Sequence, residues 1–173
     1  MALVLGTNCG FVTVAPTTDP EGTTANPAGF VRNFKVTTPN KNIKVTSLGY
    51  YQSSASEGDL NLAIYEDGGA DATDVVGGVQ VGTLGNIEWK VILGLNINLT
   101  ANTSYYLGWG ATAGQYDRTN DGTTDYNSKT DATETLTDPW GTSDGGGTFI
   151  AGVYALYEEI AEGDPAVLGE AVI

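Results

Sequence analysis

The spacing of apolar residues between positions 87 and 109 constrains the fold more than any other feature. Apolar side chains recur at every second position in residues 87–91, 95–99 and 105–109, as in strands with one buried and one solvated face. We expect both tryptophans of this stretch, Trp89 and Trp109, to lie in the core. Two antiparallel sheets packed face to face would bury such strands. The side chains expected on the buried faces are Ile87, Trp89, Val91, Tyr105, Leu107 and Trp109.

Shorter apolar alternations punctuated by turn residues continue through most of the chain. They predict further strands at residues 10–14, 30–36, 43–51, 60–65, 75–81 and 149–157. Segment 113–147 is long and polar, and it is expected to be irregular. Helical periodicity is confined to one turn near residues 156–161. The prediction is an all-β chain forming an antiparallel, jelly-roll-like β-sandwich of about eight strands.

The chain length suits one domain. A chain of 173 residues buries roughly 70% of its unfolded surface without covalent staples. We expect a single β-sandwich domain over residues 1–173, with a core at about 10–157. Apolar arms at residues 1–9 and 158–173 would flank this core.

Three short phrases of the chain carry a resemblance to a known group of domains. They are segments 44–51 (KVTSLGYY), 61–67 (NLAIYED) and 99–107 (LTANTSYYL). These phrases resemble jelly-roll β-sandwich domains of the choice-of-anchor type and related domains of unknown function. Such domains occur in extracellular enzymes, adhesins and phage structural proteins. The resemblance spans about residues 30–110 and the closing strand, and it implies a sandwich and an extracellular or virion setting.

The composition excludes several kinds of chemistry. The chain has no histidine, so a Ser-His-Asp or Cys-His arrangement cannot form. One cysteine, Cys9, can provide neither an internal disulfide nor a zinc shell. Seven basic residues oppose 21 acidic ones, for a net charge of −14. Phosphate backbones and anionic membranes are repelled by such a surface, so we expect neither nucleic acid nor membrane as a partner.

An enzymatic role is not expected, although one alternative stays open. Glycosidases use two carboxylates that flank the scissile bond, and the pairs Glu57/Asp59 and Glu66/Asp67 bracket one predicted strand. Carboxylates also gather in turns for solubility alone. The sequence therefore predicts a protein that is not an enzyme and requires no cofactor, with calcium as the one ion to consider.

The acidic segment 117–125 is the candidate calcium loop. Calcium prefers several oxygen ligands on a tightly turning loop, and Asp/Asn residues surround Gly122 here. The segment departs from the EF-hand pattern, because the third position is Thr119 and the twelfth is Ser128. The alternative is a solvated turn stabilised by Asx hydrogen bonds. The candidate ligands are Asp117, Asn120, Asp121 and Asp125.

Three aromatic residues of the polar segment 113–147 form a candidate carbohydrate site. They are Tyr116, Tyr126 and Trp140. Exposed rings of this kind stack on sugars, and neighbouring Asp and Asn residues supply hydrogen bonds. The alternative is that these rings pack back onto the sandwich as lids.

Both ends of the chain are apolar and are predicted to contact neighbouring subunits. Apolar ends can lie on, or add a strand to, another copy, and the alternative is that each end packs on its own domain. The partners expected are a homo-oligomer or neighbouring capsid or appendage subunits, and glycans as a second class. The predicted contact residues are Leu3, Val4, Leu5, Val167, Leu168, Val172 and Ile173.

The expected function combines these observations. Residues 1–6 carry no basic residue and only a brief apolar run, which does not fit a secretory signal peptide. Abundant glycine and threonine with few lysines are nevertheless typical of extracellular proteins. We expect a virion or extracellular location, reached either after removal of a signal or by another route such as virion assembly and lysis. The prediction is a non-enzymatic, self-associating structural protein of a phage or virion surface, as a capsid decoration or appendage component. The alternative is a carbohydrate-binding module of an extracellular protein.

Overall fold

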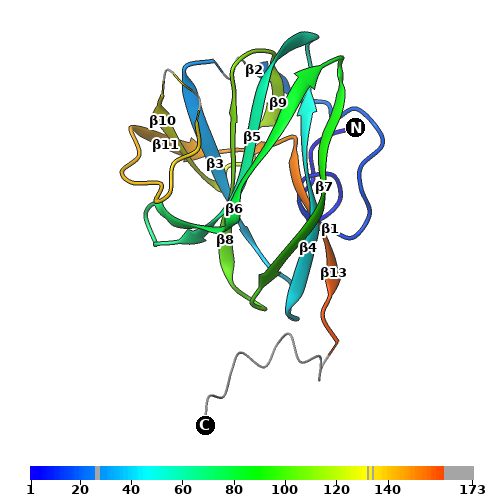
Figure 1. Cartoon of the computed structure of the whole chain (residues 1–173), viewed down its shortest axis with the longest axis vertical. Coiled ribbons are helices and arrows are strands. Elements are labelled where there is room, and N and C mark those ends of the chain that lie inside the picture. The colour runs from blue at the N-terminus through cyan, green and yellow to red at the C-terminus, as the bar shows by residue number, and fades with distance from the viewer. Residues whose placement is uncertain (26–27, 132, 134, 162–173) are drawn as a thin grey trace.

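A computed structural model describes residues 1–25, 28–131, 133 and 135–161 (Figure 1). Within these residues there are thirteen strands and no helix, which confirms the all-β class and leaves nothing helical that could span a bilayer. The strands are β1 (Gly10–Val12), β2 (Thr23–Ala25), β3 (Phe30–Thr37), β4 (Ile43–Gln52), β5 (Ser56–Asp67), β6 (Ala72–Gly85), β7 (Glu88–Leu99), β8 (Ser104–Ala111), β9 (Tyr116–Thr119), β10 (Asp125–Thr130), β11 (Gly145–Thr148), β12 (Ile150–Ala151) and β13 (Val153–Glu159).

Two facing sheets form the predicted antiparallel sandwich. One has four strands in the order β1-β13-β4-β7, and the other has six in the order β11-β10-β3-β8-β5-β6. Figure 1 shows these two layers side by side, with the long β6 and β7 crossing the front. A small third sheet, β12-β9-β2, lies at one end of the sandwich. The strands pair in antiparallel fashion except β1, which runs parallel to β13.

The main core lies between the two sheets, as the alternation in β8 and β5 predicted. Trp109 is fully buried there, with Phe34 and Tyr116 against its ring at centroid distances of 6.0 and 5.3 Å. The inward side chains of β8 and β5 belong to the same cluster, and they are Tyr105, Leu107, Trp109, Leu60, Leu62 and Ile64.

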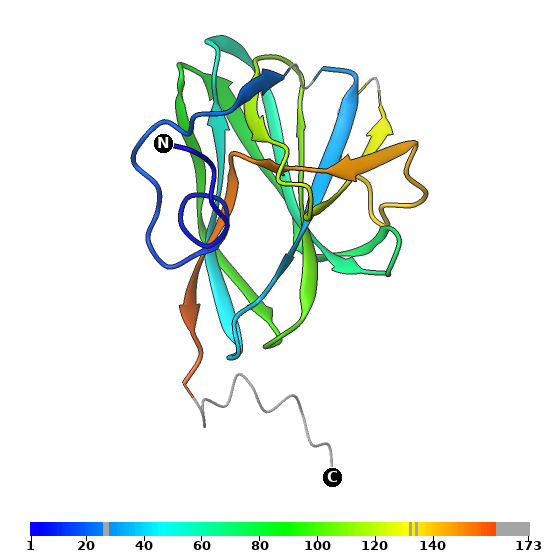
Figure 2. The ribbon, with the colours of Figure 1, turned by 180° about the vertical axis from the view of Figure 1, so that it is seen from behind.

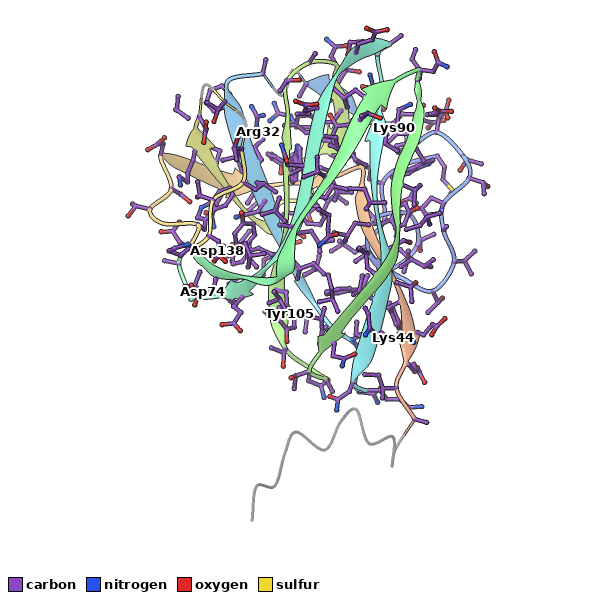
Figure 3. The ribbon with its side chains drawn as sticks, viewed as in Figure 1. Arg32, Lys44, Asp74, Lys90, Tyr105 and Asp138 are labelled. Atoms are coloured by element: carbon purple, nitrogen blue, oxygen red, sulfur yellow. The ribbon has the colours of Figure 1, made fainter. Side chains whose placement is uncertain are left out.

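The outer face of the six-stranded sheet carries a second core, which the sequence pattern did not predict. Tyr65 of β5 and Trp140 pack edge to face at 5.3 Å, and both are fully buried. The loop that carries Trp140 is fastened to β6, because Trp140 N donates to Thr73 O at 2.9 Å and Val75 N donates to Asp138 Oδ1 at 3.0 Å. Figure 3 shows the labelled Asp138 beside Asp74 of β6. Strand β5 is therefore buried on both faces.

Strand β7 corrects two expectations. Segments 87–91 and 95–99 belong to one continuous strand, which bends where its register with β4 shifts. Ile87 and Val91 are 54% and 41% exposed, so the first segment does not present a buried apolar face. Trp89 is half-buried on the outer face of the four-stranded sheet, where its Nε1 donates to Thr18 O at 3.1 Å. The reason is the register with β4, because Trp89 and Val91 are opposite Tyr51 and Gly49 on the outer face. Ile92, opposite Leu48, is the residue that packs against the main core.

Segment 113–147 was expected to be irregular, and this expectation is wrong for part of it. It contains β9, β10 and β11, which belong to two different sheets. These short strands are held in place mainly by hydrogen bonds to neighbouring strands and less by burial of one face. They therefore lack apolar alternation. The turn expected near residues 156–161 is also absent, because β13 continues to Glu159 and Ile160 N donates to Asn42 O.

The amino-terminal segment packs on its own domain. Leu3 is 5% exposed and Cys9 is fully buried, and both belong to the main core. Buried Asn8 fastens the segment, because it accepts from Val4 N at 2.7 Å and donates to Ala2 O at 2.9 Å. The expectation that residues 1–9 form an arm outside the core is therefore wrong for this part of the chain.

Candidate functional site

An open depression of about 340 Å³ lies where β9, β10 and β11 meet. Figure 2 shows this side of the molecule, where the chain from β11 to β13 crosses the back of the sandwich beside β9 and β10. We call this depression the β9–β11 pocket. Its described lining residues are Thr23, Arg118, Asn120, Tyr126, Gly146, Gly147, Thr148 and Phe149. The volume is within the usual range of small-ligand sites, which starts at about 300 Å³.

A stack of two aromatic rings and one guanidinium forms the wall of the pocket. The rings of Tyr126 and Phe149 have centroids 3.7 Å apart and planes tilted by 32°. The Arg118 guanidinium carbon lies 5.2 Å from the Phe149 centroid, within cation–π range. Phe149 is buried and rests on Trp109 of the core. Tyr126 is half-buried, so the core supports its ring while part of it faces solvent.

Strand pairing fixes the direction of Arg118. Strand β9 lies between β2 and β12, and Arg118 is paired with Thr23 on one side and with Ala151 on the other. Gly22 permits this arrangement, because a Cβ atom at that position would lie 2.7 Å from the Arg118 carbonyl oxygen. Arg118 shares a strand face with Tyr116, since side chains two positions apart in a strand point the same way.

The positive charges of Arg32 and Arg118 both act on the buried side chain of Tyr116. Burial raises the pKa of the Tyr116 hydroxyl, and the positive charges of Arg32 and Arg118 act in the opposite direction. The Arg32 guanidinium carbon lies 5.5 Å from the Tyr116 ring centroid, and Figure 3 labels Arg32 on β3. Both arginines of the chain therefore lie around one buried tyrosine.

Polar groups at the rim of the pocket come from a turn and from an edge strand. Asn120 Oδ1 accepts from Gly122 N at 3.0 Å and from Thr148 Oγ1 at 3.2 Å. Both bonds engage the amide oxygen, so the amide nitrogen is the group that Asn120 can offer to a ligand.

Strand β11 supplies backbone instead of side chains. It is the terminal strand of the six-stranded sheet, and three consecutive glycines, residues 145–147, make up most of it. A Cβ atom at Gly146 would lie 2.9 Å from the Tyr126 carbonyl oxygen, so the close approach of β11 to β10 requires a residue without one. One edge of β11 pairs with β10, and its other edge can offer backbone N–H and C=O groups to a ligand.

The candidate calcium ligands do not converge. The Asp121 carboxylate accepts from Thr123 N at 3.2 Å and from the amide and hydroxyl of Thr124. Asp117 accepts from Thr24 Oγ1 at 3.1 Å, and Asp125 lies 3.7 Å from Lys35 Nζ. Within the described residues, no three acidic, cysteine or histidine side chains gather as a metal site would require. The hydrogen bonds of Asn120 and Asp121 are those of an Asx turn, and calcium binding stays a prediction.

Two of the three aromatic residues proposed for carbohydrate binding are unsuitable. Tyr116 and Trp140 are fully buried, the first against Trp109 and the second against Tyr65. A buried ring cannot stack on a sugar, so this part of the prediction is corrected. Both rings pack on the sandwich, as the alternative held. Tyr126 lines the pocket and remains a candidate.

The predicted subunit contacts have different outcomes. Leu3 is buried in its own core, so it is not available to another subunit. Val4 and Leu5 are 49% and 41% exposed. The other four predicted contacts lie outside the described residues, and they are Val167, Leu168, Val172 and Ile173.

The carboxylates considered for glycosidase chemistry stand apart from the pocket lining. Glu57 and Asp59 are exposed near the start of β5, and Glu66 is exposed near its end. Asp67 forms an ion pair with Lys35 at 3.2 Å. The described lining of the pocket contains no carboxylate. The pocket can therefore bind by stacking and hydrogen bonding, with no acid–base pair of its own.

Sequence reasoning missed most of the pocket. Phe149 lies in a predicted strand and Arg118 in the candidate calcium loop, but nothing in either pattern indicates that they meet Thr23. Pairing across β2, β9 and β12 brings them together. The glycine run at residues 145–147 was a usable signal, because glycines in a strand often mark a close approach.

A larger depression lies at the end of β13. It has a volume of about 740 Å³ and is bordered by Asn42, Ala101 and residues 159–161, where the described part of the chain ends. Comparisons of the chain with protein-family models, curated proteins and solved structures found no match.

Proposed function

We propose that this protein is a non-enzymatic carbohydrate-binding domain of an extracellular or virion protein, and that the β9–β11 pocket is its binding site. The observation that carries the proposal is the half-buried Tyr126 ring, which Phe149 supports from behind and hydrogen-bonding groups surround. A sugar ring presents C–H groups on its faces and hydroxyls around its rim. An aromatic ring with polar neighbours complements both surfaces.

Each part of the lining has a role in this proposal. The exposed part of Tyr126 stacks on the sugar face, and the Asn120 amide nitrogen donates to a hydroxyl. The backbone of β11 offers both donors and acceptors along its outer edge. These groups belong to paired strands or to a hydrogen-bonded turn, so little conformational freedom is lost on binding.

Binding of the full chain to a glycan array, followed by calorimetry on the saccharides retained, tests the proposal. We expect Tyr126→Ala to weaken binding at least tenfold. Tyr157→Ala is the matched control, because Tyr157 is also a half-buried tyrosine that packs on the core but lies outside the pocket. Thermal melting of both variants establishes that they remain folded. Equal loss of binding in both variants, or no binding by the parent protein, would refute the proposal.

Self-association as a structural protein is the second candidate, and a different observation favours it. Leu93 and Val91 of β7 are 75% and 41% exposed on the outer face of the four-stranded sheet. Strand β7 is also the terminal strand of that sheet. Two copies of such an edge can pair about a twofold axis, which joins the sheets and covers the apolar residues.

Light scattering during size-exclusion chromatography tests this second candidate. Under it, the parent protein is a dimer or larger, and Leu93→Lys produces a monomer. Val14→Lys is the control, because Val14 is equally exposed, at 74%, but does not belong to β7. A monomeric parent protein at high micromolar concentration would count against association through β7.

A further inference from the structure

We infer that the β9–β11 pocket selects sugars that carry a carboxylate, such as uronic or sialic acids, and that Arg118 binds this group. The inference rests on the proposed saccharide function and adds the charge class of the ligand. The chain has seven cationic side chains. Arg118 stands out among them because it faces a pocket and has no acidic partner in the described residues.

The lysines differ from Arg118 in the groups that they contact. Four of the five lysines form ion pairs with carboxylates in the described residues. The fifth, Lys129, donates to the carbonyl of Trp140 and to Thr137 Oγ1. With 21 acidic residues against seven basic ones, a cation in this chain meets a carboxylate easily. Arg118 lies instead against the Phe149 ring and near the Tyr116 hydroxyl.

The guanidinium has capacity for a ligand anion. It carries five N–H donors, and an aromatic face together with one hydroxyl cannot satisfy them all. A carboxylate matches its planar fork with two parallel hydrogen bonds, the geometry for which arginine is better suited than lysine. Thr23 and Thr148 line the same pocket, and their hydroxyls can donate to the remaining lone pairs of the anion.

The nearest acidic residues in sequence do not compete for this position. Asp117 is directed to the opposite face of β9, where it accepts from Thr24. The Asp121 carboxylate is turned into its own loop by Thr123 and Thr124. The net charge of −14 repels anions at long range, but charges more than about 8 Å away are largely screened at physiological ionic strength. Within the described lining of the pocket, Arg118 is the one charged side chain, so the charge that a bound sugar contacts directly is positive.

The test compares each acidic sugar with its own methyl ester. Short oligosaccharides of galacturonic, glucuronic and mannuronic acid, and a sialyl trisaccharide, are measured with the esterified forms by calorimetry at pH 7. We expect at least one acidic sugar to bind tenfold or more tightly than its ester. Arg118→Gln should abolish this difference, so that the acid and its ester bind with the same affinity. Lys90→Gln, at a paired lysine outside the pocket, should preserve the difference.

The outcomes separate this inference from the proposed function. Binding of neutral sugars and esters as tightly as acids would overturn the inference and leave the proposed function standing. An acid preference that survives Arg118→Gln would also overturn it. If no saccharide binds the parent protein, the proposed function fails and the inference fails with it. Arg118→Lys gives a further readout, because retained charge without the planar fork should restore only part of the preference.

Discussion

The rings of Tyr126 and Phe149 lie with their centroids 3.7 Å apart, although 22 positions of the chain separate them. Tyr126 belongs to β10, and Phe149 follows β11, the strand that pairs with β10. The hairpin therefore delivers one half-exposed ring and one buried ring to the same place. The buried ring connects the pocket to the core, so changes at Phe149 should affect both stability and binding.

Replacement of Phe149 by alanine should be strongly destabilising. The side chain is 6% exposed, belongs to the main core and also contacts Trp109. Loss of a buried phenylalanine costs about 3–5 kcal/mol, because the transfer free energy is lost and a cavity remains. Urea unfolding of Phe149→Ala measures this cost. Phe30→Ala, at a phenylalanine that is 39% exposed, should cost much less, and equal costs for the two variants would contradict the burial of Phe149.

The Asp121 turn should make stability depend on pH in the acid range. Burial on its own would raise the pKa of Asp121, but hydrogen bonds from Thr124 and Thr123 outweigh it and lower the pKa below its ordinary value. The folded state therefore holds the ionised form. The contribution of the Asp121 carboxylate to the free energy of unfolding is fully present above the pKa of about 3.9 in the unfolded chain. This contribution is lost as the pH falls through the lower pKa of the folded state.

Urea unfolding between pH 6 and pH 2.5 measures the contribution of Asp121. The parent protein should lose more stability than Asp121→Asn over this range, because the variant has no carboxylate to protonate at that position. Asp74→Asn, at an exposed residue of β6, should follow the parent protein. Parallel curves for the parent and Asp121→Asn would show that the turn does not hold the ionised form.

Buried tyrosines should destabilise the fold in alkali. Burial raises the pKa of Tyr154 to about 12. Burial raises the pKa of Tyr51 to about 12 as well, with a further contribution from the Asp19 carboxylate. In the unfolded chain tyrosine ionises near pH 10. Between about pH 10 and pH 12 the unfolded state loses these protons while the folded state retains them, so the free energy of unfolding falls as the pH rises.

Absorbance at 295 nm measures the tyrosine titration directly. We expect at least two of the nine tyrosines to titrate near pH 12 or only after unfolding. In Asp19→Asn, a tyrosine should titrate earlier than in the parent protein, because Tyr51 loses its anionic neighbour. A native protein whose nine tyrosines all titrate near pH 10 would contradict the burial of these side chains.

Gly49 should tolerate no side chain. A Cβ atom there would lie 2.1 Å from Cε1 of Tyr154, which is fully buried and packs on Trp89 at 5.2 Å. Overpacking of this kind typically costs about 1–3 kcal/mol. Denaturant unfolding of Gly49→Ala measures the cost. Gly147→Ala is the matched control, because its Cβ would meet the Tyr126 ring at an ordinary 3.9 Å and should cost less than about 0.5 kcal/mol.

The alternation of apolar residues was sufficient to predict the strands that form the two layers. In β8 and β5 the inward side chains are the predicted ones, because a period of two places them on one face whatever the partner strand is. The absence of histidine and the single cysteine likewise restrict chemistry without reference to any structure. These conclusions depend only on neighbouring positions or on composition.

The tertiary structure decided which faces are covered. The same alternation that buries Trp109 leaves Val91 41% exposed, because Trp109 faces the opposite sheet whereas Val91 lies opposite Gly49 on the outer face of its own sheet. Tyr116 and Trp140 lie in a polar segment but are buried, since β9 and the loop fastened to β6 turn them inward. Arg118 meets Phe149 only through pairing between strands that are distant in the sequence. Local pattern sets the direction of a side chain relative to its own strand, and the packing of other strands determines what it meets there.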